Sequence, residues 1–121
     1  MAVRVNNKTI RMKAVPGTFL RLDRTWREGD TIAVSFPMAL HFKSVDEKSR
    51  DRVALMYGPL LMVALADKDV DLPGDAHKPE QWMHLKDKSL LTFEARDGSV
   101  TFRPLYLIHD ERYTTYCHVP L

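Results

Sequence analysis

The densest group of side chains that could perform chemistry lies near the C-terminus. His109, Asp110, Glu111 and Arg112 are consecutive, and Tyr113 follows them. A guanidinium binds a carboxylate through two parallel hydrogen bonds, so a pair of Arg112 with Asp110, with Glu111 or with a buried carboxylate would fix a tight turn. Two interpretations remain open for these four residues: a structural clamp within the turn, which we favour, or a surface on which another domain docks.

Aromatic side chains form the second group, because an exposed aromatic ring stacks on the apolar face of a sugar ring. Trp26, Trp82 and Tyr113 are the candidates for such a sugar-binding surface. Trp82 lies in a polar segment and is therefore expected to be the most exposed of the three. The alternative is that Trp26 packs at the end of a strand and that the tyrosines fill the core, where aromatic rings contribute much buried area.

Metal and catalytic sites have weaker support in the sequence. Three closely spaced aspartates resemble the start of a calcium loop: Asp67, Asp69 and Asp71. Such a loop needs a glycine at its sixth position and a glutamate at its twelfth, where this chain has Leu72 and Lys78. Zinc sites need several cysteines or histidines at tight spacing, and a serine nucleophile needs flanking glycines. We therefore expect no metal, no cofactor and no catalytic residue.

Composition places the chain among soluble globular proteins of one domain. Its 121 residues are 45% hydrophobic and 28% charged, with a net charge of +2, which is typical of such domains. The basic residues are spread out, so neither a nucleic acid nor a membrane is an expected partner. The first residues alternate like a strand and lack the apolar stretch of a signal peptide. The localisation therefore stays open. If the chain belongs to a longer parent protein, that protein could be secreted or periplasmic.

Apolar and polar residues alternate with period two along much of the chain, which is typical of half-buried strands. The cleanest example places Ile32, Val34 and Phe36 on one face. Two continuous apolar runs, residues 52–57 and 60–66, instead predict strands that are buried on both faces.

About eight short strands with regularly spaced turns predict an all-β fold, an antiparallel β-sandwich of the jelly-roll-like kind. A single sandwich domain is expected to span residues 1–121. Residues 67–88 contain two prolines, one glycine and many charges. They are expected to form an irregular excursion from the sandwich, with one helical turn near residues 79–83.

Several segments resemble, in order, the β-region of one enzyme family. The longest is FRPLYLIHDERYTTY at residues 102–116, and shorter ones are VRVN, PGTFL, SFPM and VALMYGPL at residues 3–6, 16–20, 35–38 and 53–60. Together they resemble the C-terminal β-sandwich region of the β-L-arabinofuranosidase-type glycoside hydrolases, which are glycoside hydrolase family 127 and its relatives.

The resemblance implies a non-catalytic accessory domain. In that family, catalysis belongs to a helical barrel with a zinc-bound cysteine cluster and glutamates. This chain lacks the barrel and has one cysteine, Cys117, so no catalytic residue carries over. The implied role is to pack on or cap the catalytic barrel of a parent enzyme, of which the chain would be a fragment.

The aromatic candidates support an alternative function, a stand-alone carbohydrate-binding module. A fragment would also expose a strand edge or an apolar patch that faces the barrel, and such surfaces favour self-association. The expected partners are therefore the catalytic barrel, a second copy of the chain, or a carbohydrate.

Overall fold

The chain forms two compact units, Met1–Pro37 and Met38–Leu121. The computed structural model describes residues 1–119. The prediction of an all-β antiparallel fold is confirmed, with ten strands in place of about eight. No helix in this described part is long and apolar enough to cross a bilayer. That the two units together make one domain, as expected over residues 1–121, stays a prediction.

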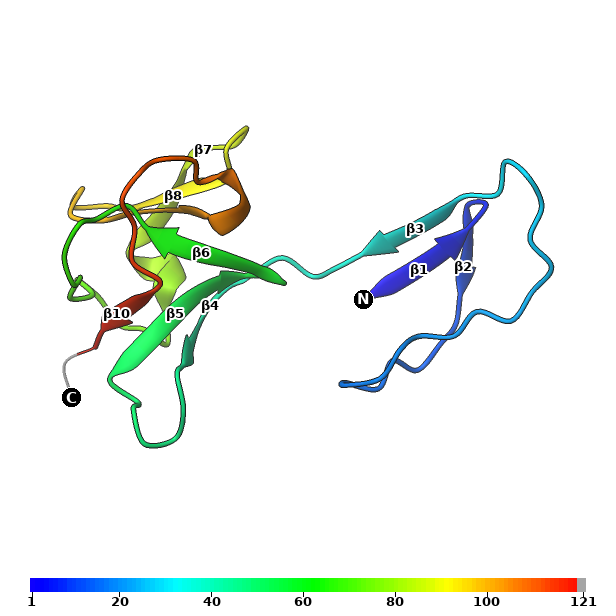
Figure 1. Ribbon diagram of the computed structural model, residues 1–121, viewed down its shortest axis with the longest axis horizontal. Coiled ribbons are helices and arrows are strands. Elements are labelled where there is room, and N and C mark those ends of the chain that lie inside the picture. Colours follow the sequence, from blue (N-terminus) through cyan, green and yellow to red (C-terminus); the bar gives the residue numbers. More distant parts are fainter. Residues whose placement is uncertain (120–121) are drawn as a thin grey trace. The chain divides into compact units, whose positions relative to one another are not determined.

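The first unit is a three-stranded sheet in the order β2-β1-β3, coloured blue to cyan in Figure 1. Its strands are β1 (Ala2–Val5), β2 (Lys8–Ile10) and β3 (Ile32–Ser35). Asn6 and Asn7 join β1 to β2, with φ angles of 50° and 66°. A two-residue hairpin of this kind requires positive φ at both positions, and asparagine adopts it more readily than most residues.

The apolar face of the first sheet follows from its register. Val3 pairs with Val34, and Val5 pairs with Ile32, so all four side chains lie on one side of the sheet. Val3 and Val5 on the central strand are buried, whereas Ile32 and Val34 on the edge strand are 53% and 46% exposed. The first unit therefore has a small core beside an open apolar edge.

The second unit is a seven-stranded antiparallel sheet around β5 (Arg52–Tyr57). β4 (Leu40–Ser44) lies along one edge of β5, while β6 (Leu60–Ala64) and β10 (Tyr116–His118) pair with successive parts of its other edge. From β6 the sheet continues through three more strands: β9 (Thr101–Pro104), β8 (Thr92–Ala95) and β7 (Met83–Asp87).

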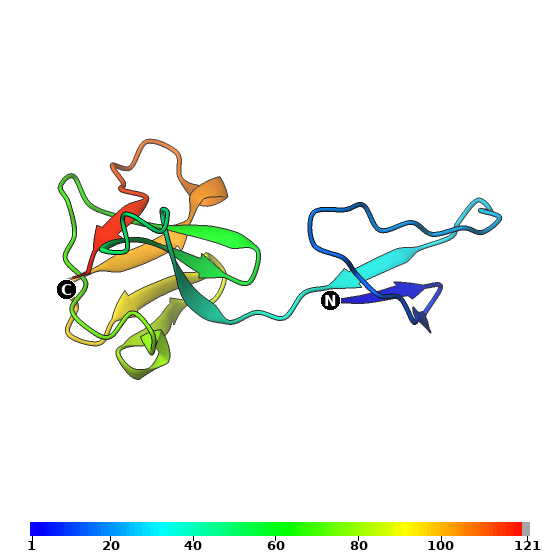
Figure 2. The same cartoon turned by 90° about the horizontal axis from the view of Figure 1, so that it is seen from below.

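Aromatic contacts show that this sheet curls around one core. β4 and β7 lie at opposite ends of the strand order, yet Phe42 of β4 stacks on Trp82, which directly precedes β7, with ring centroids 6.0 Å apart. Phe42 also meets Phe102 of β9 edge to face at 6.3 Å. The strands wrap accordingly in Figure 2. The predicted sandwich-like arrangement is thus present within this unit.

The core of the second unit fills the inside of the curl. Leu55, Met62 and Phe102 are among its fully buried side chains. Val63 is equally inaccessible although it alternates with Met62 and therefore points to the opposite face. Consecutive buried residues in β5 and β6 confirm that both apolar runs are buried on two faces at their centres.

The predicted excursion at residues 67–88 is only partly irregular. A single 3-10 turn, η1 (Pro79–Gln81), confirms the predicted helical turn. Met83–Asp87 was expected to be irregular, but it forms β7 and pairs with β8. Lys86 of β7 reaches Glu94 of β8 at 2.7 Å. An edge strand that carries charged side chains resembles a polar loop in sequence, which explains the error.

A second 3-10 turn, η2 (Leu105–Leu107), follows β9 directly. It begins the segment that leads to the charged cluster His109 to Arg112 and returns to the sheet at β10. Part of this segment lies over the face of the sheet that carries Val63, because Glu111 lies 3.8 Å from Arg103. Arg103 pairs with Val63 and therefore shares its face.

Candidate functional site

Two segments leave the sheet of the second unit side by side and form the candidate site. Ala64, the last residue of β6, and Thr114 exchange two backbone hydrogen bonds, each 3.0 Å long from nitrogen to oxygen. This bridge brings residues 65–69 next to residues 111–113. Between them lies an open hollow of about 420 Å³, here named the Tyr113 hollow. Its polar and aromatic lining comes from both segments: Asp67, Lys68, Asp69, Glu111, Arg112, Tyr113 and Thr114.

Glu111 is the anchored carboxylate of the hollow. Its Oε2 atom accepts a hydrogen bond from the backbone N–H of His109 at 2.8 Å, and Oε1 lies 3.8 Å from a guanidinium nitrogen of Arg103. The backbone hydrogen bond from His109, more than the nearby Arg103 charge, lowers the pKa of Glu111 below its usual range. Glu111 is therefore a carboxylate at neutral pH, able to accept hydrogen bonds but not to supply a proton.

Arg103 contacts the candidate site but is not among the candidates from the sequence. It lies on β9 between the buried residues Phe102 and Pro104, on the opposite face of the sheet. Its Nε–H donates to the hydroxyl of Thr92 on β8 at 3.2 Å. The signal in the sequence is an arginine at the outward position of an otherwise apolar strand, but its partner Glu111 could be found only from the fold.

The clamp in the turn differs from the expected pairing. Glu111 faces Arg103 rather than Arg112, and within residues 1–119 no ion pair of Arg112 with Asp110 or Glu111 is formed. Arg112 instead lines the exposed Tyr113 hollow. The difference arises because Arg103 is already anchored on the sheet, whereas Arg112 is exposed. A clamp or docking role for His109 to Arg112 as a group stays a prediction.

The three aromatic candidates lie in different surroundings. Tyr113 is 46% exposed and lines the hollow. Trp26 belongs to the first unit, where the guanidinium of Arg24 lies 4.9 Å from its ring centroid. Trp82 was expected to be the most exposed, but it is partly buried, and its indole N–H donates to the backbone oxygen of Asp75 at 2.9 Å. Trp82 therefore packs against the core although most of the residues around it in the sequence are polar.

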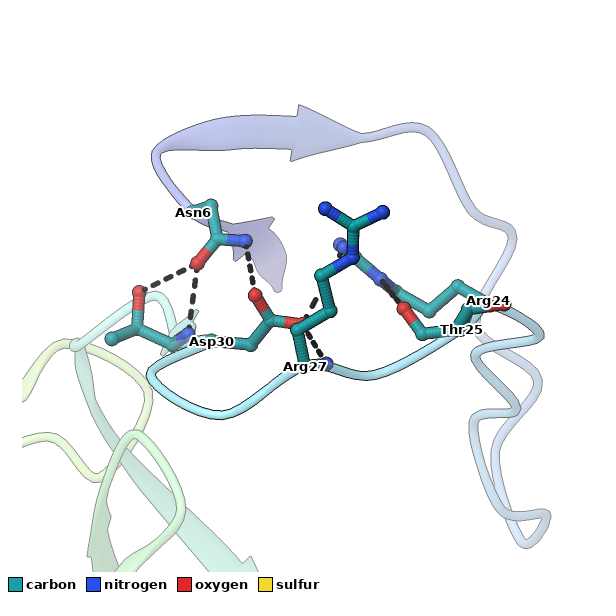
Figure 3. Close-up of polar contacts among 6 residues, drawn as sticks. Asn6, Arg24, Thr25, Arg27 and Asp30 are labelled. Carbon is teal, nitrogen blue, oxygen red and sulfur yellow. Dashed lines mark hydrogen bonds and ion pairs between the residues drawn. The ribbon is translucent and has the colours of Figure 1, made fainter.

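A hydrogen-bond network in the first unit ties the β1–β2 turn to the start of β3, as Figure 3 shows. The amide of Asn6 donates to Asp30 at 2.9 Å, and its oxygen accepts from the backbone N–H of Thr31 at 2.9 Å. Asp30 also accepts from the backbone N–H of Arg27 at 2.8 Å and lies 3.6 Å from Arg24. The Arg27 and Asn6 hydrogen bonds lower the pKa of Asp30. The Asp30 carboxylate is thus engaged in holding the loop to the β1–β2 turn.

The three aspartates considered for calcium do not converge. Asp71 faces Nδ1 of His118 at 3.1 Å, and Asp51 faces Nε2 of the same ring at 3.6 Å. Asp67 and Asp69 line the Tyr113 hollow, and Asp69 also borders, with Asp71, a small cavity beside His118. In the part of the chain that the structure describes, no group of three or more His, Cys, Asp or Glu side chains is placed to hold a metal ion.

The exposed apolar edge of the first unit is the other candidate surface. Ile32, Val34 and Phe36 alternate along β3 and the residue after it, and they are 53%, 46% and 49% exposed.

Residues 1–38 match the family model of the beta-L-arabinofuranosidase, GH127 middle domain. The search of curated proteins found no match. The matched residues cover the whole first unit, including this edge.

The match confirms the resemblance to β-L-arabinofuranosidase-type glycoside hydrolases for residues 1–38. It supports an accessory domain of such an enzyme, since the family model describes a middle domain rather than a catalytic one. The placement in a C-terminal region stays a prediction, and so does the role of the second unit, which lies beyond the matched residues.

Proposed function

We propose that the chain is a non-catalytic accessory β-region of a glycoside hydrolase and that it packs on the catalytic barrel of its parent enzyme. The observation that carries this proposal is the exposed apolar edge of β3 within the residues that match the GH127 middle domain. A partner that covers this edge would complete the core that Val3 and Val5 begin.

The size of the first unit supports this role. Its 37 residues bury two side chains, Val3 and Val5, within the described structure. Units below about 40 residues rarely stabilise themselves without a disulfide, a metal or a partner. Ile32, Val34 and Phe36 together form an apolar stripe on an edge strand, and such a surface favours burial against another protein surface. An apolar face of a barrel would supply that cover.

The five groups in residues 1–119 that have a shifted pKa do not resemble a catalytic acid or nucleophile. Glycoside hydrolysis generally uses two carboxyl groups, one of which has a raised pKa and donates a proton. Glu111, Asp30, Asp87 and Asp97 have lowered pKa values instead, chiefly because of hydrogen bonds to their carboxylates. Burial raises the pKa of the Cys117 thiol to about 11, which makes it a poor nucleophile at neutral pH.

The packing role is tested by binding the purified chain to a separately produced catalytic barrel of a β-L-arabinofuranosidase, measured by isothermal titration calorimetry. Val34→Lys places a charge in the apolar edge and is expected to weaken binding at least tenfold. Val45→Lys is the matched control, because Val45 is similarly exposed, at 44%, and lies outside β3. Equal binding by Val34→Lys and the unmodified chain would remove the apolar edge from the proposal.

The non-catalytic role has its own test. The purified chain alone is expected to release no nitrophenol from a nitrophenyl arabinofuranoside. Measurable turnover that survives removal of metal by a chelator would overturn this part of the proposal and leave the packing result to be judged separately.

The same apolar edge makes a second copy of the chain an alternative partner. In the absence of a barrel, we expect concentration-dependent self-association by light scattering, and Val34→Lys should reduce it. A strictly monomeric mass at high protein concentration would count against self-association through this edge.

A further inference from the structure

We propose that the Tyr113 hollow binds a neutral sugar ring. The inference concerns the second unit alone and does not depend on packing against a catalytic barrel. The hollow combines Tyr113 and the charged turn with the aspartates after β6, which lie far from them in the sequence.

The charges of the hollow favour a neutral, hydroxyl-rich ligand. Asp67, Asp69 and Glu111 supply carboxylate acceptors, while Lys68 and Arg112 supply donors. Three negative charges against two positive ones disfavour an anion, and the two cations disfavour a cationic ligand or a metal ion. Each sugar hydroxyl both donates and accepts a hydrogen bond, so a sugar ring can satisfy both kinds of side chain at once.

The donors and acceptors are available to a ligand. In the described part of the chain, no ion pair engages Asp67, Lys68, Asp69 or Arg112, in contrast to Glu111, which faces Arg103. Exposed charged side chains of this kind are hydrated when free, and a ligand hydroxyl replaces that water at little net cost. The lining is therefore suited to reversible and weak recognition.

Tyr113 supplies the surface on which the ring would stack. Its side chain is 46% exposed and lines the hollow, and it lies in the chain between Arg112 and Thr114 of the bridge. An aromatic ring has two rotatable bonds and a flat apolar face, so it offers contact area at low entropic cost. The volume of about 420 Å³ is within the range of small-ligand sites, roughly 300–1,000 Å³.

The base of the hollow is held in place by the sheet. The backbone bridge between Ala64 and Thr114 fixes where its two walls begin. Glu111 is fixed between the N–H of His109 and the guanidinium of Arg103. Holding the walls before the ligand arrives reduces the entropy lost on binding.

The test is a titration of the ¹⁵N-labelled chain with methyl α-L-arabinofuranoside and methyl β-D-galactopyranoside, followed by amide chemical shifts. We expect shifts confined to residues 65–69 and 111–114, with a Kd on the order of 1 mM. Tyr113→Ala should weaken binding at least tenfold, whereas Tyr113→Phe should stay within about threefold because it keeps the stacking face. Tyr106→Ala is the control, since Tyr106 is 64% exposed and lies outside the hollow.

Charged probes decide the ligand class. Binding of either glycoside more tightly than D-glucuronate and D-glucosamine supports the proposal. Binding of only a charged sugar, shifts outside the two segments, or no shifts up to about 100 mM glycoside would overturn it. If Tyr113→Ala fails to fold, Arg112→Ala and Asp69→Asn carry the test, and unchanged affinity in both would also overturn it.

Discussion

Gly74 provides a direct test of how Trp82 is held in the second unit. A Cβ atom at Gly74 would overlap the five-membered ring of Trp82 and lie 2.7 Å from its Nε1 atom. The indole cannot move away freely, because Nε1–H donates to Asp75 and the ring stacks on Phe42. Gly74→Ala therefore forces overpacking rather than a simple side-chain rotation.

The expected cost follows from two opposing effects. Overpacking a well-packed site costs about 1–3 kcal/mol. Replacing glycine by alanine restricts the unfolded chain and returns about 0.4–1 kcal/mol. The net destabilisation should be about 1–2 kcal/mol, which at a urea m value of about 2 kcal/mol per M lowers the urea midpoint by roughly 0.5–1 M.

A double-mutant cycle with Trp82→Leu isolates the clash. Leucine keeps an apolar side chain at position 82 but removes the ring that the new Cβ would meet. In the Trp82→Leu background, Gly74→Ala should be neutral or slightly stabilising, measured by urea unfolding with circular dichroism. An equal loss of stability in both backgrounds, or no loss in the unmodified chain, would refute this account of Trp82.

Two further predictions concern titrating groups. Glu111 has a lowered pKa in the folded state. Its contribution to stability is therefore fully present above pH 4.5, the ordinary pKa of the side chain, and is lost as the pH falls through the lower folded-state pKa. Glu111→Gln should flatten this dependence of the unfolding free energy on acid pH, and an unchanged profile would contradict the prediction. Cys117, with a pKa of about 11, should react with a disulfide reagent at pH 8 at least tenfold more slowly in the folded chain than in urea. Equal rates in both conditions would show that Cys117 is not held in the core.

The sequence predicts those parts of the fold that depend on local pattern. The apolar runs of β5 and β6 identify the centre of the sheet because residues on both faces are buried there. The turn at Asp97 and Gly98 is equally local. Gly98 has a φ of 77°, which glycine adopts without strain, and the Asp97 carboxylate accepts the backbone N–H of Ser99 at 2.9 Å.

Features that depend on long-range register are not predictable from the same patterns. β7 has too many charges to resemble a core strand, and it is a strand because β8 pairs with it. The contact of Glu111 with Arg103 likewise requires the turn to return over β9 and β8. A pattern of alternating residues does not show which distant strand will lie opposite, so Arg103 could not be recognised from the sequence as the arginine nearest to Glu111.

The contact of Glu111 with Arg103 rather than with Arg112 also bears on whether the turn at residues 109–112 is a clamp or a binding surface. If Arg112 had paired with Glu111, the turn would be held but its donors and acceptors would be consumed. Because Arg103 anchors Glu111 from the sheet side, the turn is held while Arg112 and Tyr113 remain on the open side. Arg103→Ala should therefore loosen the wall at Glu111 and weaken sugar binding without removing any side chain that touches the ligand. In this proposal Arg103 holds the turn from the sheet and the hollow binds the sugar, so loss of the first contact is expected to weaken the second.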